Sequence, residues 1–175
     1  MSLHAYTNVF EPIVEEPVIE IVTAPAPSDV HSLFRVSTSR APQFIDVTDV
    51  VAGLLESSGL ESGIAVVTSQ HTTASIKLNE NEPELLRDME KFLCDIASPN
   101  VYYRHNDFAI RTCNMEEDEC PNAHSHCQHL LLNASESIPV QDGKMMLGKW
   151  QRIFLVELDR PRPRNVVVSF LGRVY

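Results

Sequence analysis

The feature that most constrains the fold is a series of short segments with the pattern of β-strands, joined by turns. The run Gly63–Ser69 is almost wholly apolar or small, which is typical of a buried strand. Asp142-Gly143 has the composition of a tight hairpin turn and precedes a long strand predicted from Met145 to Leu158. Further strands are predicted at 33–37, 44–47, 74–78, 137–140 and 166–171. Because strands outnumber helices and are joined by hairpins, we expect an α+β fold with a mainly antiparallel sheet system.

Three helices are expected among these strands. Thr48 or Asp49 caps a helix that ends near Gly59, Pro83 suits the first turn of a second, and a third covers Ala123 to Leu132. In the second helix, apolar residues recur at helical spacing, which predicts that one stripe packs on the sheet. They are Leu85, Leu86, Met89, Phe92, Leu93 and Ile96.

The chain divides into an N-terminal arm and one domain. Residues 1–30 hold four prolines with glutamates between short Val/Ile pairs, which indicates an extended or mobile arm. Val18–Val22 can still add an edge strand. Residues 31–175 form the domain. No apolar run of about 18 residues predicts a membrane span, and the N-terminus lacks a signal-peptide pattern, so we expect a cytoplasmic protein.

Cysteine and charge content indicate which compartment and which kinds of binding partner to expect. The four cysteines form no CxxC pair, so free thiols in a reducing compartment are expected. A net charge of -10 argues against nucleic acid as a partner. Residues 144–175, however, hold 7 Lys+Arg against 2 Asp+Glu. Within this basic end Arg160, Arg162 and Arg164 can face an anionic small molecule or an acidic neighbouring subunit, the alternative being a solvated loop.

Three histidines in separate polar segments are the candidate reactive groups. His71, His105 and His126 each offer an imidazole, and three converging imidazoles make a metal site or an acid–base pocket. On a helix His124 points away from His126, whereas His129 shares its face.

Polar residues beside these histidines are the candidate ligand-binding and acid–base groups. Thr72 and Thr73 can hold an anion or water, or can satisfy a turn. Glu80 is a candidate general base, or complements the dipole of the next helix. Asp88 is predicted to point to the same cleft or to solvent, and Gln151 is a candidate ligand-binding residue.

Taken in order, these segments resemble the YjbQ-like family, also named the secondary thiamine-phosphate synthase family. The similarity spans roughly residues 31–173. It is carried by His71-Thr72-Thr73-Ala74-Ser75, Asn79-Glu80, Asp88-Met89, Tyr103-Arg104-His105, Asn122-Ala123-His124-Ser125-His126, Ile138-Pro139-Val140, Gly143 and Leu147-Gly148-Lys149-Trp150-Gln151. Two departures are His124, where the family often has a small or acidic residue, and Cys127, where it has an apolar one.

The resemblance implies an antiparallel β-sandwich domain assembled as a homotrimer. It implies that His71, His105 and His126 converge as metal ligands, with Glu80 and Asp88 as catalytic groups beside His71. Substrate would then contact Thr72, Thr73, Asn79 and Gln151. The implied activity is slow joining of a hydroxymethylpyrimidine diphosphate to a thiazole phosphate, with release of diphosphate.

The chemistry leaves alternatives open. A tri-histidine site suits zinc better than magnesium, although magnesium can accompany a diphosphate. A metal-dependent hydrolase of a small phosphorylated metabolite, with Glu80 taking a proton from water, is therefore a second hypothesis. A trimeric protein that binds such a metabolite without turnover is a third.

Overall fold

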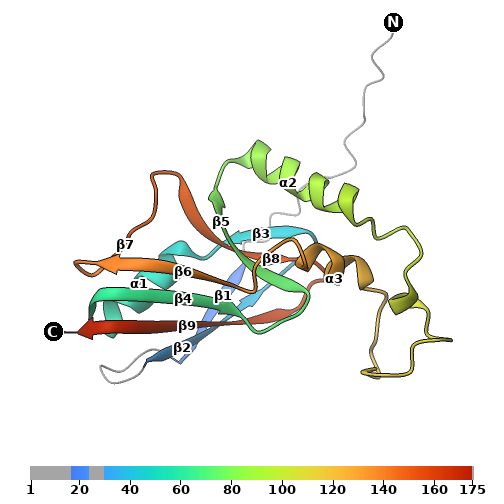
Figure 1. Cartoon of the computed structure of the whole chain (residues 1–175), viewed down its shortest axis with the longest axis horizontal. Helices are drawn as coiled ribbons and strands as arrows, with labels where there is room; N and C mark the ends of the chain where they lie inside the picture. The colour runs from blue at the N-terminus through green and yellow to red at the C-terminus, as the bar shows by residue number, and fades with distance from the viewer. Residues whose placement is uncertain (1–16, 24–29, 175) are drawn as a thin grey trace, which may run out of the picture.

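The computed structural model describes residues 17–23 and 30–174, which form nine strands, three α-helices and one 3₁₀ turn (Figure 1). The strands are β1 (Val18–Thr23), β2 (His31–Ser37), β3 (Gln43–Asp46), β4 (Leu60–Ser69), β5 (Ala74–Glu80), β6 (Ser135–Gln141), β7 (Lys144–Met145), β8 (Gln151–Glu157) and β9 (Pro163–Val174). The helices are α1 (Thr48–Ser58), α2 (Pro83–Ile96), η1 (Arg104–Asn106) and α3 (Ala123–His129).

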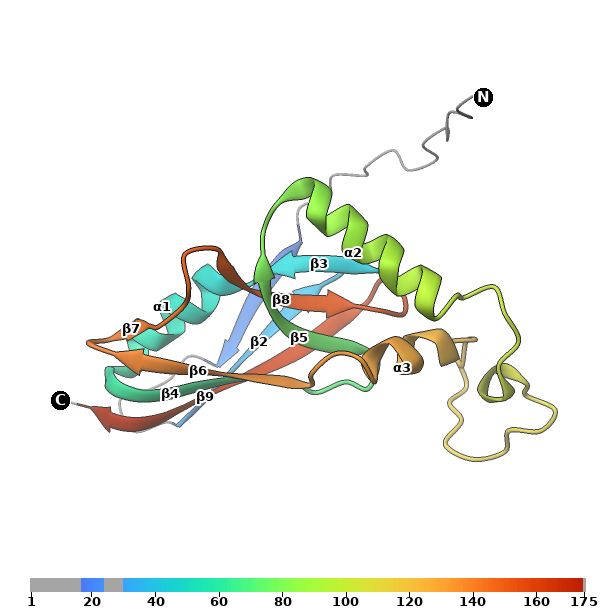
Figure 2. The same cartoon turned by 45° about the horizontal axis from the view of Figure 1, so that its top comes forward.

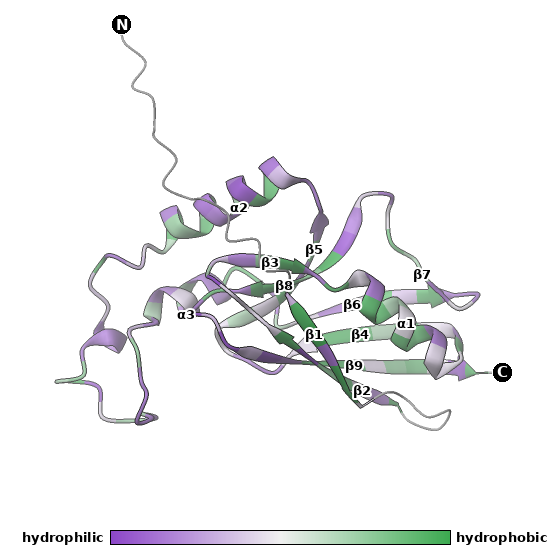
Figure 3. Cartoon of the chain, turned by 180° about the vertical axis from the view of Figure 1, so that it is seen from behind, coloured by the Kyte–Doolittle hydropathy of each residue, from purple (hydrophilic) through white to green (hydrophobic). Residues whose placement is uncertain are grey.

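Two antiparallel sheets enclose the main core. One sheet has the order β1-β2-β9-β4-β6-β7 and the other β3-β8-β5. Alternate residues of both sheets, together with α1, bury their side chains in the space between them; examples are Phe34, Ile76 and Val168. The strands and α1 accordingly carry many apolar residues (Figure 3). The predicted α+β class with antiparallel sheets and three helices is therefore confirmed.

Helix α2 covers the outer face of the three-stranded sheet (Figure 2). Pro83 stands in its first turn, and the Glu82 carboxylate accepts hydrogen bonds from the Glu84 and Leu85 backbone N–H groups. Leu93 packs against Phe154 in the layer between helix and sheet.

The prediction that all six apolar residues of α2 pack on the sheet is wrong. The side chains of Phe92 and Ile96 are 59% and 53% exposed. The predicted stripe is wider than the face that the three-stranded sheet covers, so one edge of it stays outside.

Three predicted boundaries also differ from the structure. The long strand from Met145 is divided into β7 and β8, because the chain leaves one sheet and joins the other. The third helix ends at His129, since Asn133 must reach Ile76 in a β-bridge. Val47 takes the N-cap position of α1, and Asp46 accepts the hydrogen bond from the Thr48 backbone N–H.

The predicted edge strand in the N-terminal arm is confirmed, because β1 pairs with β2 at the edge of the larger sheet. The rest of the predicted arm, residues 1–16 and 24–29, lies outside the described residues. Among the described residues, no helix has the length and apolar character needed to cross a membrane.

At one position, strands β4 and β9 approach too closely for any side chain. Gly63 and Gly172 face each other in register, and a Cβ built on Gly63 would lie 2.1 Å from the Leu171 carbonyl oxygen. Gly63 also has φ of 157°, which L-residues rarely adopt. The central pairing of the larger sheet thus depends on glycine here.

We expect Gly63→Ala to lower the free energy of unfolding by about 2–4 kcal/mol, because the methyl group must displace backbone. Gly53→Ala in α1 is the matched control, since no atom lies within 4 Å of its built Cβ; it should raise stability by roughly 0.5–1 kcal/mol. Urea unfolding followed by circular dichroism measures both. Equal effects of the two substitutions would contradict the assigned register.

A buried ion pair joins the two sheets at the end of β8. Arg164 of β9 donates to Glu157 of β8 from Nε at 2.6 Å and also from Nη2. Their side chains are 2% and 0% exposed. The Thr38 hydroxyl also donates to the carboxylate at 3.0 Å.

Glu157→Gln should lower the free energy of unfolding by about 3–5 kcal/mol, because it leaves a buried guanidinium charge unpaired. Glu84→Gln removes the same carboxylate charge from a surface pair with Arg87, so its effect should stay below about 1 kcal/mol. Chemical unfolding measures the difference. A loss of less than about 1 kcal/mol for Glu157→Gln would show that the pair is not important for stability.

Candidate functional site

His71 lies in the connection between β4 and β5 and is held by β9. Its Nε2 accepts a hydrogen bond from the Asn165 backbone N–H at 2.8 Å. Burial lowers the pKa of His71, and the positive charges of Arg164 and Arg162 lower it further. The ring is therefore neutral near pH 7. Because Nε2 accepts a hydrogen bond, the proton is on Nδ1, and Nδ1 is available as a hydrogen-bond donor.

Thr73 and Arg162 are polar neighbours of His71. The buried Thr73 hydroxyl accepts from Arg162 Nη2 at 3.0 Å and from Arg164 Nη2 at 3.1 Å. Arg162 also forms an ion pair with Asp159. Its Nε is buried and has no hydrogen-bond partner among the described residues. Thr72 is exposed.

The rings of His105 and His126 lie next to each other. Their ring centroids lie 4.9 Å apart with the planes at 73°. The Asn106 side chain beside His105 accepts from the Ala123 backbone N–H at 2.9 Å, which ties η1 to the start of α3. Burial lowers the pKa of His126, and the neighbouring His105 lowers it further. The Nε2 atom of His105 is buried without a hydrogen-bond partner in the described part of the chain.

Asp159, just after β8, connects these two groups. Its carboxylate pairs with Arg162 and accepts a weak hydrogen bond from the Cys120 thiol at 3.8 Å. Its negative charge also acts on His126, where it raises the pKa against the larger effect of burial. We define the Asp159 cluster as His71, Thr73, His105, His126, Asp159 and Arg162.

The other predicted residues gather at the opposite end of β5. Glu80 pairs in register with Gln151, whereas Ala74 pairs with Glu157. The six residue steps from Ala74 to Glu80 span about 20 Å. The sheet therefore separates Glu80 from the Asp159 cluster of the same chain.

A cavity of about 280 Å³ opens at this Glu80 end. It is lined by Asp46, Glu80, Asn81, Lys149, Trp150 and Arg152. Its walls are held by Arg152, which donates to Asp46 at 2.7 Å and Asp49 at 2.9 Å.

The remaining predicted residues have structural partners or face solvent. The Asn79 amide contacts Met89 Sδ at 3.0 Å, and Gln151 Oε1 accepts from the Gly148 backbone N–H at 2.8 Å. Asp88 is exposed on α2. Across residues 17–23 and 30–174 of one chain, no three His, Cys, Asp or Glu side chains are placed to hold a metal. The assignment of His71 to the same metal as the His105–His126 pair remains a prediction.

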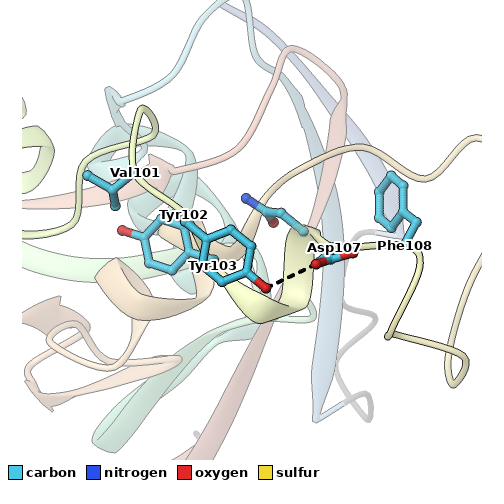
Figure 4. A pocket seen from close by; sticks show the side chains of 6 residues that line it. Val101, Tyr102, Tyr103, Asp107 and Phe108 are labelled. Atoms are coloured by element: carbon cyan, nitrogen blue, oxygen red, sulfur yellow. Dashed lines mark hydrogen bonds between the residues drawn. The ribbon is translucent and has the colours of Figure 1, made fainter.

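A hollow of about 380 Å³ lies beside η1 (Figure 4). Val101, Tyr102, Tyr103, Asn106, Asp107 and Phe108 line it, and the Tyr102 hydroxyl donates to Asp107 at 3.0 Å. The exposed rings of Tyr102 and Phe108 make an aromatic surface on the chain segment that carries His105.

Two important residues were not singled out from the sequence. Asp159 lies in the connection two residues after the end of β8, and connections that follow strands often carry functional residues, so this position could have identified it. Arg111 lies in the irregular segment, where it pairs with Glu119 at 3.0 Å and influences His126. No local pattern identifies it. Of the basic residues that were singled out, Arg162 lies in the cluster, while Arg160 pairs with Asp118.

The four cysteines are free, as predicted. Burial raises the pKa of the Cys120 thiol, and the negative charge of Asp159 raises it further. The thiol is therefore protonated near pH 7 and acts as a weak donor.

Comparison with known proteins places the chain in a family. The model described as UPF0047 protein YjbQ-like matches residues 32–173. A UPF0047 protein of Methanothermobacter thermautotrophicus is 44% identical over 136 residues, which cover 78% of this chain and 87% of the relative. A YbjQ-like protein of unknown function from Sulfolobus solfataricus has 32% identity and a TM-score of 0.73, covering 89% of this chain and 100% of that chain. A hypothetical protein from Aeropyrum pernix K1 has 36% identity and the same TM-score of 0.73, with coverages of 82% and 98%. The chain belongs to the UPF0047 (YjbQ-like) family.

Proposed function

We propose that the Asp159 cluster binds a phosphorylated small molecule and that the protein is a low-rate enzyme of the thiamine-phosphate synthase type. In this reaction a thiazole nitrogen attacks the methylene carbon of hydroxymethylpyrimidine diphosphate. A C–N bond forms, the C–O bond to diphosphate breaks, and diphosphate leaves. The observation that carries the proposal is Arg162, whose buried Nε has no hydrogen-bond partner among the described residues and whose positive charge acts on His71.

These groups suit a phosphate. A guanidinium can bind phosphate oxygens through two parallel hydrogen bonds, and a neutral imidazole N–H adds a third donor. Arg162 is already oriented by Thr73 and Asp159, so little reorganisation is needed when negative charge develops on the leaving diphosphate. His71 is positioned by its bond to Asn165 and acts as the donor to the same anion.

The histidine pair suits a divalent metal, and zinc better than magnesium. The buried, unpartnered Nε2 of His105 beside the His126 ring has the chemistry of a ligand pair. His71 fits less well in one chain, because Nε2 is engaged by Asn165. His71, His105 and His126 remain the proposed ligands, and His71 would have to release Asn165 first. When bound, such a metal would stabilise negative charge on phosphate oxygens.

The proposed catalytic carboxylates belong to the other end of the molecule. Glu80 and Asp88 are the acid–base candidates, and Asn79 and Gln151 are the proposed substrate contacts at that end. Thr72 is a further proposed substrate contact, near His71.

We further propose a homotrimer, since a large apolar surface is exposed on α2 and the segment that follows. Four free thiols suit a reducing compartment, which supports a cytoplasmic location.

Arg162→Gln should weaken binding of inorganic diphosphate about 10- to 100-fold, because charged hydrogen bonds of this kind contribute about 1.5–3 kcal/mol. Arg160→Gln is the matched control, since that guanidinium pairs with Asp118 outside the cluster. Isothermal titration calorimetry with diphosphate measures both affinities. Equal weakening by the two variants would place the anion elsewhere.

His105→Asn should abolish bound zinc and thiamine-phosphate formation from the two precursors. His31→Asn should change neither, because His31 is exposed and bonded to Ser169 in the sheet. Elemental analysis and product chromatography are the measurements.

Zinc retained in His105→Asn would refute the metal assignment. Phosphate released from either precursor alone would favour the hydrolase. Diphosphate binding without any product would favour a non-catalytic binding protein.

A further inference from the structure

The hollow beside η1 contains a carboxylate whose charge is not compensated. Asp107 accepts hydrogen bonds from the Tyr102 hydroxyl at 3.0 Å and from the Ala109 backbone N–H at 3.1 Å. Both donors are neutral, and no Lys, Arg or His within residues 17–23 and 30–174 forms an ion pair with Asp107. The bond to Asp107 raises the pKa of the Tyr102 phenol, so this donor keeps its proton near pH 7. The lining of the hollow therefore carries a net negative charge.

Aromatic rings surround this charge. Tyr102 and Tyr103 precede η1 and Phe108 follows it, and all three line the hollow. In Figure 4 the Asp107 carboxylate lies between the side chains of Tyr102 and Phe108. These two residues are 72% and 42% exposed, so a ligand can reach their rings. The face of an aromatic ring attracts cations, and the rings and the carboxylate thus favour the same sign of charge.

Hydrogen bonds hold the walls of the hollow in place before a ligand binds. The Tyr103 hydroxyl donates to the Ser98 carbonyl at 3.0 Å, and the Tyr102 hydroxyl is held by Asp107. The turn itself is closed by the Asn106 backbone N–H, which donates to the Tyr103 carbonyl at 3.0 Å. A ligand entering this space of about 380 Å³ therefore meets side chains that are already oriented, which lowers the entropic cost of binding.

The charge and the rings together select a class of ligand. A neutral apolar molecule would cover Asp107 without compensating its charge, which costs free energy. An anion would be repelled by the same carboxylate. The arginines of this segment do not neutralise it, because Arg111 is bound to Glu119 at 3.0 Å and the exposed Arg104 forms no ion pair with Asp107. A small organic cation with a flat or methylated face satisfies both the carboxylate and the rings.

The hollow adjoins the histidine pair, because η1 belongs to both. Asn106 lines the hollow and is the next residue after His105, so their Cα atoms are about 3.8 Å apart. The Asn106 side chain also accepts from the Ala123 backbone N–H at the start of α3, the helix that carries His126. A site for positive charge thus lies beside the site proposed to bind phosphate.

We infer that the hollow is a binding site for a small organic cation and that, in the proposed reaction, it holds the thiazole ring. The inference deepens the proposed function and rests on it for the identity of the ring. The residues that carry it are Tyr102, Tyr103, Asp107 and Phe108, and none of them belongs to the Asp159 cluster.

The reaction gives these residues a defined task. The thiazole nitrogen contributes its lone pair to the new C–N bond, and diphosphate leaves with the electrons of the C–O bond. The ring nitrogen then carries a formal positive charge, and no proton has to move. Asp107 and the surrounding rings stabilise this charge as it develops, while Arg162 stabilises the negative charge on the leaving diphosphate.

A charged and an uncharged form of one ring test the hollow without turnover. The probes are N-methylthiazolium and thiazole, which is uncharged near pH 7. Each is titrated into the full-length protein in its native assembly and followed by ligand-observed NMR. We expect the cation to bind about 5- to 30-fold more tightly, because contact between a cation and aromatic rings contributes this much. Equal affinities would overturn the inference, as would a hollow that binds neither probe because a neighbouring copy fills it.

Variants locate this preference. Asp107→Asn removes the charge and keeps an oxygen that accepts from Tyr102, so the preference for N-methylthiazolium should be lost. Asp118→Asn is the matched control, because it removes an exposed carboxylate of the same segment that pairs with Arg160. Tyr102→Leu, which removes a ring and keeps the carboxylate, should weaken the cation more than thiazole. Unchanged affinity for inorganic diphosphate shows that each variant is folded. A preference that survives both Asp107→Asn and Tyr102→Leu would place the cation elsewhere.

Steady-state kinetics separates the ring assignment from the reaction itself. Asp107→Asn should lower kcat for thiamine-phosphate formation, because the positive charge on the ring develops only during the reaction. A wild-type protein that prefers the cation but forms no thiamine phosphate would refute the proposed reaction and leave the cation site standing. Full activity of Asp107→Asn would refute the assignment of the thiazole ring to the hollow and leave the reaction standing.

Discussion

The buried pair of Glu157 and Arg164 is the interaction on which the architecture of the site depends. Arg164 comes from the six-stranded sheet and Glu157 from the three-stranded sheet, so their contact fixes one end of the sandwich. The carboxylate is well satisfied, because it also accepts from the Thr38 hydroxyl and from the backbone N–H groups of Leu158 and Asp159. Burying two charges is costly, and this number of hydrogen bonds is what makes the pair tolerable in the core.

The same pair positions the groups proposed to bind the ligand. Arg164 donates to Thr73, which places the threonine hydroxyl beside Arg162. Glu157 fixes the backbone of Asp159, whose side chain then holds Arg162. Burial and the positive charges of Arg164 and Arg162 lower the pKa of His71, so the ring stays neutral and its Nδ1 remains a hydrogen-bond donor. The Asp159 cluster is therefore organised before any ligand arrives, which is the condition for electrostatic stabilisation without reorganisation.

The sequence predicts features that depend on neighbouring residues. Pro83 and Asp142-Gly143 mark the start of α2 and the hairpin turn because their backbone preferences act locally. Their polar contexts and the family resemblance predict that His71, His105 and His126 converge; in the structure the ring centroids of His105 and His126 lie 4.9 Å apart, and the place of His71 beside them stays a prediction. The break between β7 and β8 was missed because both halves have strand-like composition, and only the change of sheet separates them. The residues around Glu157 in the sequence do not identify the partner of its buried charge, because that partner, Arg164, lies on another strand, β9.

Periodicity also fails to say what an apolar face contacts. The pattern of α2 identifies six apolar positions but not that the three-stranded sheet is too narrow to cover them all. Phe92 and Ile96 therefore stay exposed at the outer edge of the helix. Apolar contact is not directional, so the pattern of α2 alone cannot specify what covers this edge.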